Sequence, residues 1–241
     1  MNLKFTGFAL LTFGLLSYAL YQGMVVAPTE ATMGEVQRIF YYHVPSGWTA
    51  FLCVYANLGA SLYYLAKRCA KADAIAIASA EVGMVFLTVV LVTGPIWGKP
   101  VWGIWWTWDP RLTSTLVLWL IYASYLLVRR YATTGQGPVI GAVLAAFGAV
   151  DVVFVYMSTR WFRTQHPQPV LGGGEGSGIH PAMLHALLLN FLAFVALACL
   201  LIWMRYRLER IRQQVEEAHA LRAIHSSQPS ISGTPKMRIP S

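Results

Sequence analysis

The segment Gly94–Thr115, GPIWGKPVWGIWWTWDPRLTST, decides how the rest of the chain has to be arranged. Three prolines and three glycines interrupt it, and a core helix gains nothing from such residues because both disfavour helix interiors. Its only charged residues are Lys99, Asp109 and Arg111. It also holds five of the nine tryptophans of the chain: Trp97, Trp102, Trp105, Trp106 and Trp108.

The spacing of the aromatic residues predicts a short helix with one aromatic face. The four positions Trp102, Trp105, Trp106 and Asp109 stand at i, i+3, i+4 and i+7, so they would share a face that ends in a carboxylate, with Arg111 close by. Tryptophan also gathers where a membrane meets water, and a simple interfacial belt is the alternative. Anchoring needs no aligned face, so the pattern favours a platform for a large flat ligand with an acidic edge.

The composition indicates an all-α polytopic membrane protein. Of the 241 residues, 56% are hydrophobic and 12% are charged, about half the charged fraction of a soluble domain. The net charge of +8 does not indicate nucleic-acid binding, because basic residues fall in short gaps between apolar runs, as the positive-inside rule requires. These gap residues include Lys67, Arg68, Lys71, Arg129 and Arg130. The three cysteines form no CxxC pair, so neither a thiol redox pair nor covalent haem attachment through CxxCH is expected.

Six transmembrane helices are expected within a single membrane domain, residues 1–204, with both termini in the cytoplasm. The predicted spans cover about 5–27, 48–66, 74–93, 112–128, 139–157 and 181–204, each apolar enough to cross a bilayer of about 30 Å. We expect the first to be an uncleaved helix and not a signal peptide. Residues 205–241 are expected to form a cytoplasmic tail, first helical and then disordered.

Three predicted outer segments then lie at the same membrane face. They carry His43, the tryptophan-rich loop, and His166. Haem iron accepts axial imidazole, its macrocycle stacks on aromatic rings, and its propionates pair with guanidinium groups. The set matches haem well, although a lone histidine in an outer loop is more often a surface residue than a ligand, and only the presence of two beside aromatic residues brings the two interpretations level. We interpret His180 and His185 as residues at the start of a helix.

Two carboxylates are predicted inside the membrane. Glu81 and Asp151 fall within the third and fifth spans, where an ionisable residue is usually functional. No basic partner can be identified within the spans, which slightly favours protonated or hydrogen-bonded groups that order helix packing.

Three stretches together resemble one family: WGIWWTWDPRLTS at Trp102–Ser114, RIFYYHVPSGW at Arg38–Trp48 and WFRTQHPQPVLGGGEGSG at Trp161–Gly178. They are similar to the haem-handling proteins of the WWD family and, within it, to the CcmC family of haem exporter proteins C. The resemblance implies a non-enzymatic protein of the bacterial inner membrane that binds haem b non-covalently at its periplasmic face. It implies His43 and His166 as axial ligands over the tryptophan platform. His180 departs from the pattern, where an acidic residue is expected before Pro181.

The resemblance also implies partners and a role in c-type cytochrome maturation. Haem would pass to a periplasmic haem chaperone, maturation protein E, beside an ABC transporter of maturation proteins A and B and a small membrane protein, maturation protein D. One alternative is a transporter that moves haem across the bilayer, with Glu81 and Asp151 lining its path. Another is a haem-attaching synthase of the wider family, but such chains are expected to be longer and to carry histidines in mid-span, and this chain has none there. The lack of mid-span histidines also argues against a quinol-oxidising cytochrome b, which needs paired imidazoles inside the membrane.

Overall fold

The computed structural model describes residues 3–132, 135–167, 169, 171 and 178–227, and in this part of the chain it contains helices and no β-strand. Six helices are long and apolar enough to cross a membrane, which confirms the predicted all-α fold. In chain order the elements are α1 (Leu3–Tyr21), the π-helical turn η1 (Gln22–Val26), the 3-10 turn η2 (Glu35–Ile39), α2 (Phe40–Lys67), α3 (Ala70–Trp102), α4 (Pro110–Tyr131), α5 (Gly137–Trp161) and α6 (Pro181–Ser227).

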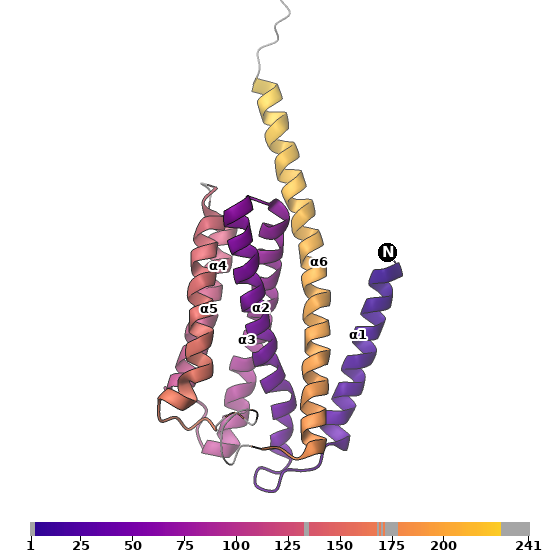
Figure 1. Cartoon of the computed structure of the whole chain (residues 1–241), viewed down its shortest axis with the longest axis vertical. Helices are drawn as coiled ribbons and strands as arrows, with labels where there is room; N and C mark the ends of the chain where they lie inside the picture. Colours follow the sequence, from indigo (N-terminus) through magenta and orange to yellow (C-terminus); the bar gives the residue numbers. More distant parts are fainter. Residues whose placement is uncertain (1–2, 133–134, 168, 170, 172–177, 228–241) are drawn as a thin grey trace, which may run out of the picture.

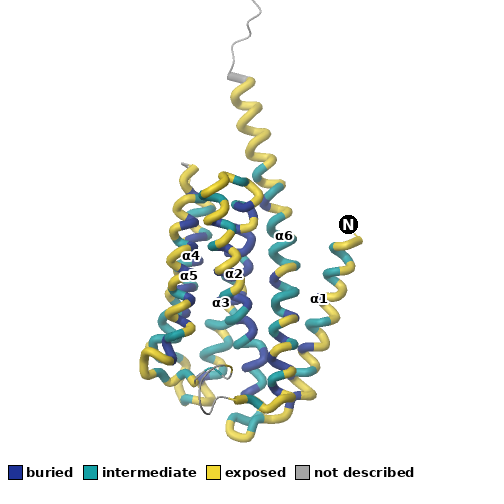
Figure 2. The backbone as a smooth tube through the Cα atoms, viewed as in Figure 1, coloured by how far each residue is buried: buried dark blue, intermediate teal, exposed yellow. Residues whose placement is uncertain are grey.

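Successive helices run in alternating directions along one bundle (Figure 1). The connections α1–α2, α3–α4 and α5–α6 gather at one end, here called the loop end, while the described parts nearest both chain termini lie towards the other end (Figure 1). Helix α1 stands to one side and packs mainly on α6, while α2 to α5 form the compact part (Figures 1 and 2). Because these three connections lie at the same end of the bundle, residues far apart in sequence meet there.

Small residues allow α4 and α5 to pack closely. A Cβ added to Gly148 would lie 2.7 Å from the Tyr122 ring, and one added to Gly141 would lie 3.0 Å from the Tyr125 ring. Both tyrosines are buried and stack with their ring centroids 6.0 Å apart. Without strong hydrophobic attraction between helices in lipid, this close contact of small and large side chains holds them together.

Helix α3 is longer than the sequence predicts. It continues through Pro95 and Pro100 to Trp102, where Gly103 closes it with a left-handed backbone (φ 78°) and donates its N–H to Lys99 O at 2.9 Å. The predicted short helix over Trp102–Asp109 is therefore wrong. Gly103 ends one helix and the Asp109–Pro110 pair begins the next, so the intervening residues are non-helical.

Two further boundaries differ from the predicted spans. Helix α2 begins at Phe40, which places His43 in its first turn and not in a loop. Helix α5 continues to Trp161, so the third outer segment is shorter than predicted. Helix α6 is uninterrupted from the bundle through the predicted helical part of the tail, while the segment predicted to be disordered falls almost entirely outside the described residues.

Ion pairs join helices at the end opposite the loops. Arg129 donates to Asp73 at 2.7 Å, and Gln213 of α6 donates to the same carboxylate at 3.2 Å. Arg205 donates to Glu81 through both Nε and Nη2. The sequence shows no basic partner for Glu81 within the predicted spans, and the partner indeed lies one residue beyond the sixth: α6 continues past the predicted span end, and Arg205 meets the α3 carboxylate.

Replacing Arg205 by Met should destabilise the bundle, because the Glu81 carboxylate would be left without its cation. The pair is partly exposed, so we expect a loss of about 1–2 kcal/mol in the free energy of unfolding. Thermal unfolding of the detergent-purified protein measures this, with Arg207→Met on the exposed side of α6 as the matched control. Equal unfolding temperatures for the two variants would show that the ion pair adds nothing.

Candidate functional site

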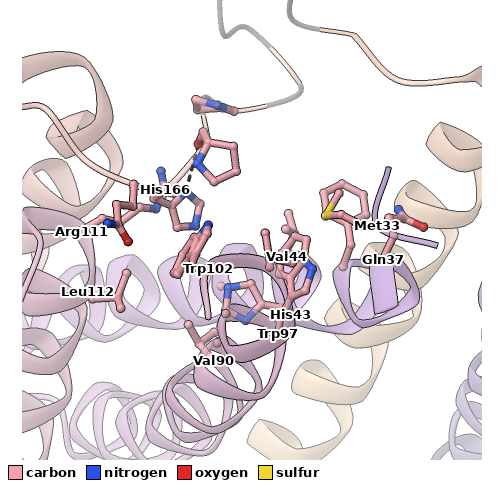
Figure 3. A pocket seen from close by; sticks show the side chains of 18 of the residues that line it. Met33, Gln37, His43, Val44, Val90, Trp97, Trp102, Arg111, Leu112 and His166 are labelled. Atoms are coloured by element: carbon pink, nitrogen blue, oxygen red, sulfur yellow. Dashed lines mark hydrogen bonds between the residues drawn. The ribbon is translucent and has the colours of Figure 1, made fainter. Parts of the chain in front are cut away.

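A cavity of about 900 Å³ lies at the loop end of the bundle. Its lining comes from the α1–α2 and α3–α4 connections, from helices α2 to α6 and from the described residues between α5 and α6. Figure 3 shows His166 and Arg111 on one side, Met33 and Gln37 on the other, and Trp102 between them. This volume suits a single ligand of substantial size.

His43 reaches the cavity from the first turn of α2. Its Nδ1 atom shares a 2.8 Å hydrogen bond with Thr93 Oγ1 on α3, and its ring meets Trp97 edge-on with centroids 5.7 Å apart. Gly94 lies against the imidazole, since a Cβ added there would contact Cε1 at 3.4 Å, an ordinary van der Waals distance. Residues of two helices therefore hold the ring, with Nδ1 turned towards α3.

His166 approaches the cavity from the connection after α5. Its Nδ1 lies 3.0 Å from Pro167 O, and because a carbonyl only accepts, Nδ1 carries the proton and Nε2 holds the free lone pair. Burial, with a smaller effect from the Arg111 charge, lowers the pKa of His166 from 6.5 to about 4. The imidazole is therefore neutral at pH 7 by a wider margin than the ordinary pKa predicts.

The Asp109 carboxylate connects His166 to α4. Its Oδ1 accepts the backbone N–H groups of Arg111 and Leu112 at 2.9 Å, which makes Asp109 the N-cap of that helix. Its Oδ2 accepts the Thr164 hydroxyl at 2.8 Å, and Thr164 Oγ1 in turn accepts the His166 backbone N–H at 3.0 Å. Asp109 thus positions the start of α4 and the segment that carries His166, and it does not itself line the cavity.

Arg111 supplies a cation to the cavity wall. Its Nη1 is buried and has no hydrogen-bond partner among the described residues. A buried guanidinium N–H without an acceptor is costly, and an anionic ligand group would satisfy it.

The five tryptophans divide into two groups. Trp97, Trp102 and Trp106 line the cavity, whereas Trp105 and Trp108 are 60% and 75% exposed and lie outside its lining. The Nε1 atoms of Trp97 and Trp106 are buried without a partner in the described part of the chain. The structure therefore brings three of the five tryptophans of the predicted platform together around one space, with Arg111 beside them.

Two other histidines were open to interpretation. His180 also lines the cavity, but its Nδ1 accepts the Ala182 N–H at 3.3 Å, so in the neutral ring the proton sits on Nε2. His185 is exposed on α6 and is not part of the lining. Sequence reasoning missed Gln37, a buried polar residue that lines the cavity, and Thr93 behind His43, because no motif or spacing marks either.

The described residues contain no group of three or more His, Cys, Asp or Glu side chains that could hold a metal ion. A ligand that brings most of its own metal coordination would need only one or two imidazoles from the protein.

Fold and site together define a multi-pass membrane protein with a ligand cavity at one end of its helix bundle. The chain belongs to the CcmC family, described as "Heme exporter protein C", whose sequence model matches residues 3–221. It is 34% identical over 211 residues to the heme exporter protein C of Bradyrhizobium diazoefficiens, covering 87% of this chain and 80% of that protein. It is 33% identical over 198 residues to the heme exporter protein C of Escherichia coli K12, covering 77% and 75%. A putative cytochrome c biosynthesis ccmC-like mitochondrial protein of Marchantia polymorpha is 33% identical over 180 residues, covering 75% and 76%.

Replacing Asp109 by Ala should loosen both α4 and the segment that carries His166, because one carboxylate serves both. We expect a loss of about 1 kcal/mol in unfolding free energy, the usual cost of removing an N-cap. We also expect faster amide hydrogen exchange at Phe162 to His166. Asp109→Asn separates the two roles: its one amide oxygen can keep the α4 cap, but its amide nitrogen only donates and cannot accept the Thr164 hydroxyl, so exchange at Phe162 to His166 should still be faster. Unchanged exchange at His166 in the alanine variant would disprove the link between the two segments.

Proposed function

We propose that this protein binds haem b non-covalently in the cavity, as cargo, and delivers it to a periplasmic haem chaperone during c-type cytochrome maturation. The observation that carries the proposal is that His43 and His166, from different segments, line one cavity. Membership of the haem exporter protein C family supports the choice of haem among large flat ligands.

The chemistry of the lining fits this cargo. The ring nitrogens that remain for iron are the Nε2 atoms, because His43 and His166 use Nδ1 for hydrogen bonds within the protein. Three tryptophans supply aromatic surface for the macrocycle, and Arg111 Nη1 supplies an unused donor for a propionate. Membership of the haem exporter protein C family supports a carrier and not an enzyme.

Release requires that a ligand can be exchanged. His43 sits on a membrane helix, whereas His166 sits in a connection held by Thr164 and Asp109. A partner can approach the connection from outside the bundle and replace an imidazole there. The acceptor implied by the family is maturation protein E, with the ABC transporter of maturation proteins A and B and the small maturation protein D in the same assembly.

The basic residues support a periplasmic position for the cavity. Lys67, Arg68, Lys71, Arg129 and Arg130 lie at helix ends opposite the loop end. By the positive-inside rule that end faces the cytoplasm, so the cavity faces the periplasm and both termini are cytoplasmic. Trp105 and Trp108, outside the cavity, are then free to contact the membrane interface or a partner.

A transporter that carries haem across the bilayer is less well supported. Glu81 is paired with Arg205 and does not line the cavity, and neither does Asp151. Asp151 keeps one buried oxygen without a hydrogen-bond partner in the described residues. A haem-attaching synthase is disfavoured by the lack of mid-span histidines.

The axial ligands can be tested by absorption spectroscopy of the purified protein with haem. His43→Ala and His166→Ala should each convert a low-spin six-coordinate spectrum to a five-coordinate one that added imidazole restores. His185→Ala, on the exposed face of α6, is the control. Loss of the six-coordinate spectrum in His180→Ala, with retention in His166→Ala, would overturn the ligand assignment.

The aromatic wall can be tested separately from the ligands. Replacing Trp97 and Trp106 by Ala should weaken haem binding by more than about 100-fold, since each buried ring contributes about 2 kcal/mol. The double replacement of Trp105 and Trp108, which lie outside the lining, should retain haem. Equal losses in a titration of both double variants would show that the tryptophans act only as a membrane belt.

A further inference from the structure

Thr93 lies behind His43 and outside the cavity lining, yet its hydroxyl determines how the histidine is protonated. Thr93 Oγ1 lies 2.6 Å from Val89 O one turn earlier on α3, and 2.8 Å from His43 Nδ1. A hydroxyl has one proton, and the Val89 carbonyl can only accept. The proton is therefore given to Val89, and Thr93 offers a lone pair to His43.

This assignment leaves one tautomer for a neutral His43. Its Nδ1 must donate to Thr93 Oγ1 and so carries the proton, which leaves the lone pair on Nε2. The bond also fixes the ring in rotation, because Nδ1 is held against α3. The opposite tautomer would place two lone pairs face to face and would present a proton at Nε2.

A second threonine on the same helix supports the direction of the bond. Thr88 Oγ1 donates to Met84 O at 2.8 Å and accepts the Trp119 Nε1–H at 2.9 Å. An indole nitrogen can only donate, so this threonine must be the acceptor. The two sites share one geometry: a threonine bonded back to its own helix that accepts an N–H from a neighbouring ring.

Thr93 matters for His43 because a neutral imidazole, unlike an indole, can carry its proton on either of two ring nitrogens. His180 shows the alternative within the same cavity, because its Nδ1 accepts a backbone N–H and its proton is left on Nε2. Without Thr93, nothing on the described part of α3 would select between these two states for His43.

We propose that Thr93 is a positioning residue that holds His43 as the Nδ1–H tautomer, with Nε2 ready to bind the iron of a haem cargo. The inference rests on the proposed function for the identity of the cargo. An accepting hydroxyl at Nδ1 also increases the electron donation of the imidazole, which stabilises ferric over ferrous iron. Loss of the outer partner of a ligating histidine commonly weakens metal binding by about 10- to 100-fold.

The test compares Thr93→Val, which keeps the shape and removes the hydroxyl, with Thr93→Ser, which keeps the hydroxyl. Thr88→Val is the matched control, since it removes an equivalent threonine that faces Trp119. Nitrogen NMR of the haem-free protein labelled in histidine should show a protonated Nδ1 at His43 in the wild type and in Thr93→Ser. Thr93→Val should show mixed or reversed tautomers, while Thr88→Val should match the wild type.

The same variants are then titrated with haem b. Thr93→Val should bind about 10-fold or more weakly and have a higher reduction potential, with added imidazole restoring the six-coordinate spectrum; Thr93→Ser and Thr88→Val should match the wild type. An unchanged His43 tautomer together with unchanged affinity and potential in Thr93→Val would overturn the role of Thr93. Failure of the wild type to bind haem would instead refute the proposed function, and the NMR result would still decide the tautomer.

Discussion

One carboxylate, that of Asp109, connects the parts of the site that come from distant sequence. Its Oδ1 starts α4 by accepting two backbone N–H groups, and its Oδ2 accepts Thr164, whose oxygen holds the backbone of His166. The start of α4 also sets the position of Arg111, two residues later. The cation of the cavity and one of its imidazoles therefore share a single anchor, which is not part of the cavity lining.

The six helices could be predicted because hydrocarbon leaves a long apolar run no other way to satisfy its backbone. The convergence of His43, Arg111 and His166 also followed from the sequence, since alternate connections of a bundle must share one face. The end of α3 could not be predicted in this way. Pro95, Pro100 and the nearby glycines are typical of a loop in a soluble protein, but they are tolerated in a helix packed among others.

Contacts between residues that are far apart in the sequence could not be predicted either. Glu81 and Arg205 are separated by 124 positions and meet only because α6 continues straight beyond the apolar run. The position of Thr93 beside His43 depends on the rotation of α3 against α2, which no periodicity determines. The aromatic wall differs from the predicted face for a related reason: without the predicted helix, Trp105 is exposed and outside the cavity lining, whereas Trp102 and Trp106 line the cavity together with Trp97.

The proposed function requires two imidazoles of this chain, from α2 and from the α5–α6 connection, to bind one haem iron through Nε2. Pulsed electron paramagnetic resonance of the ferric haem-loaded protein, prepared with nitrogen-15 histidine, detects such bonds individually. We expect a low-spin iron coupled to two histidine nitrogens, each assigned by its loss in the His43 or His166 variant. A high-spin iron, or coupling to one histidine nitrogen or none in the wild type, would contradict this coordination.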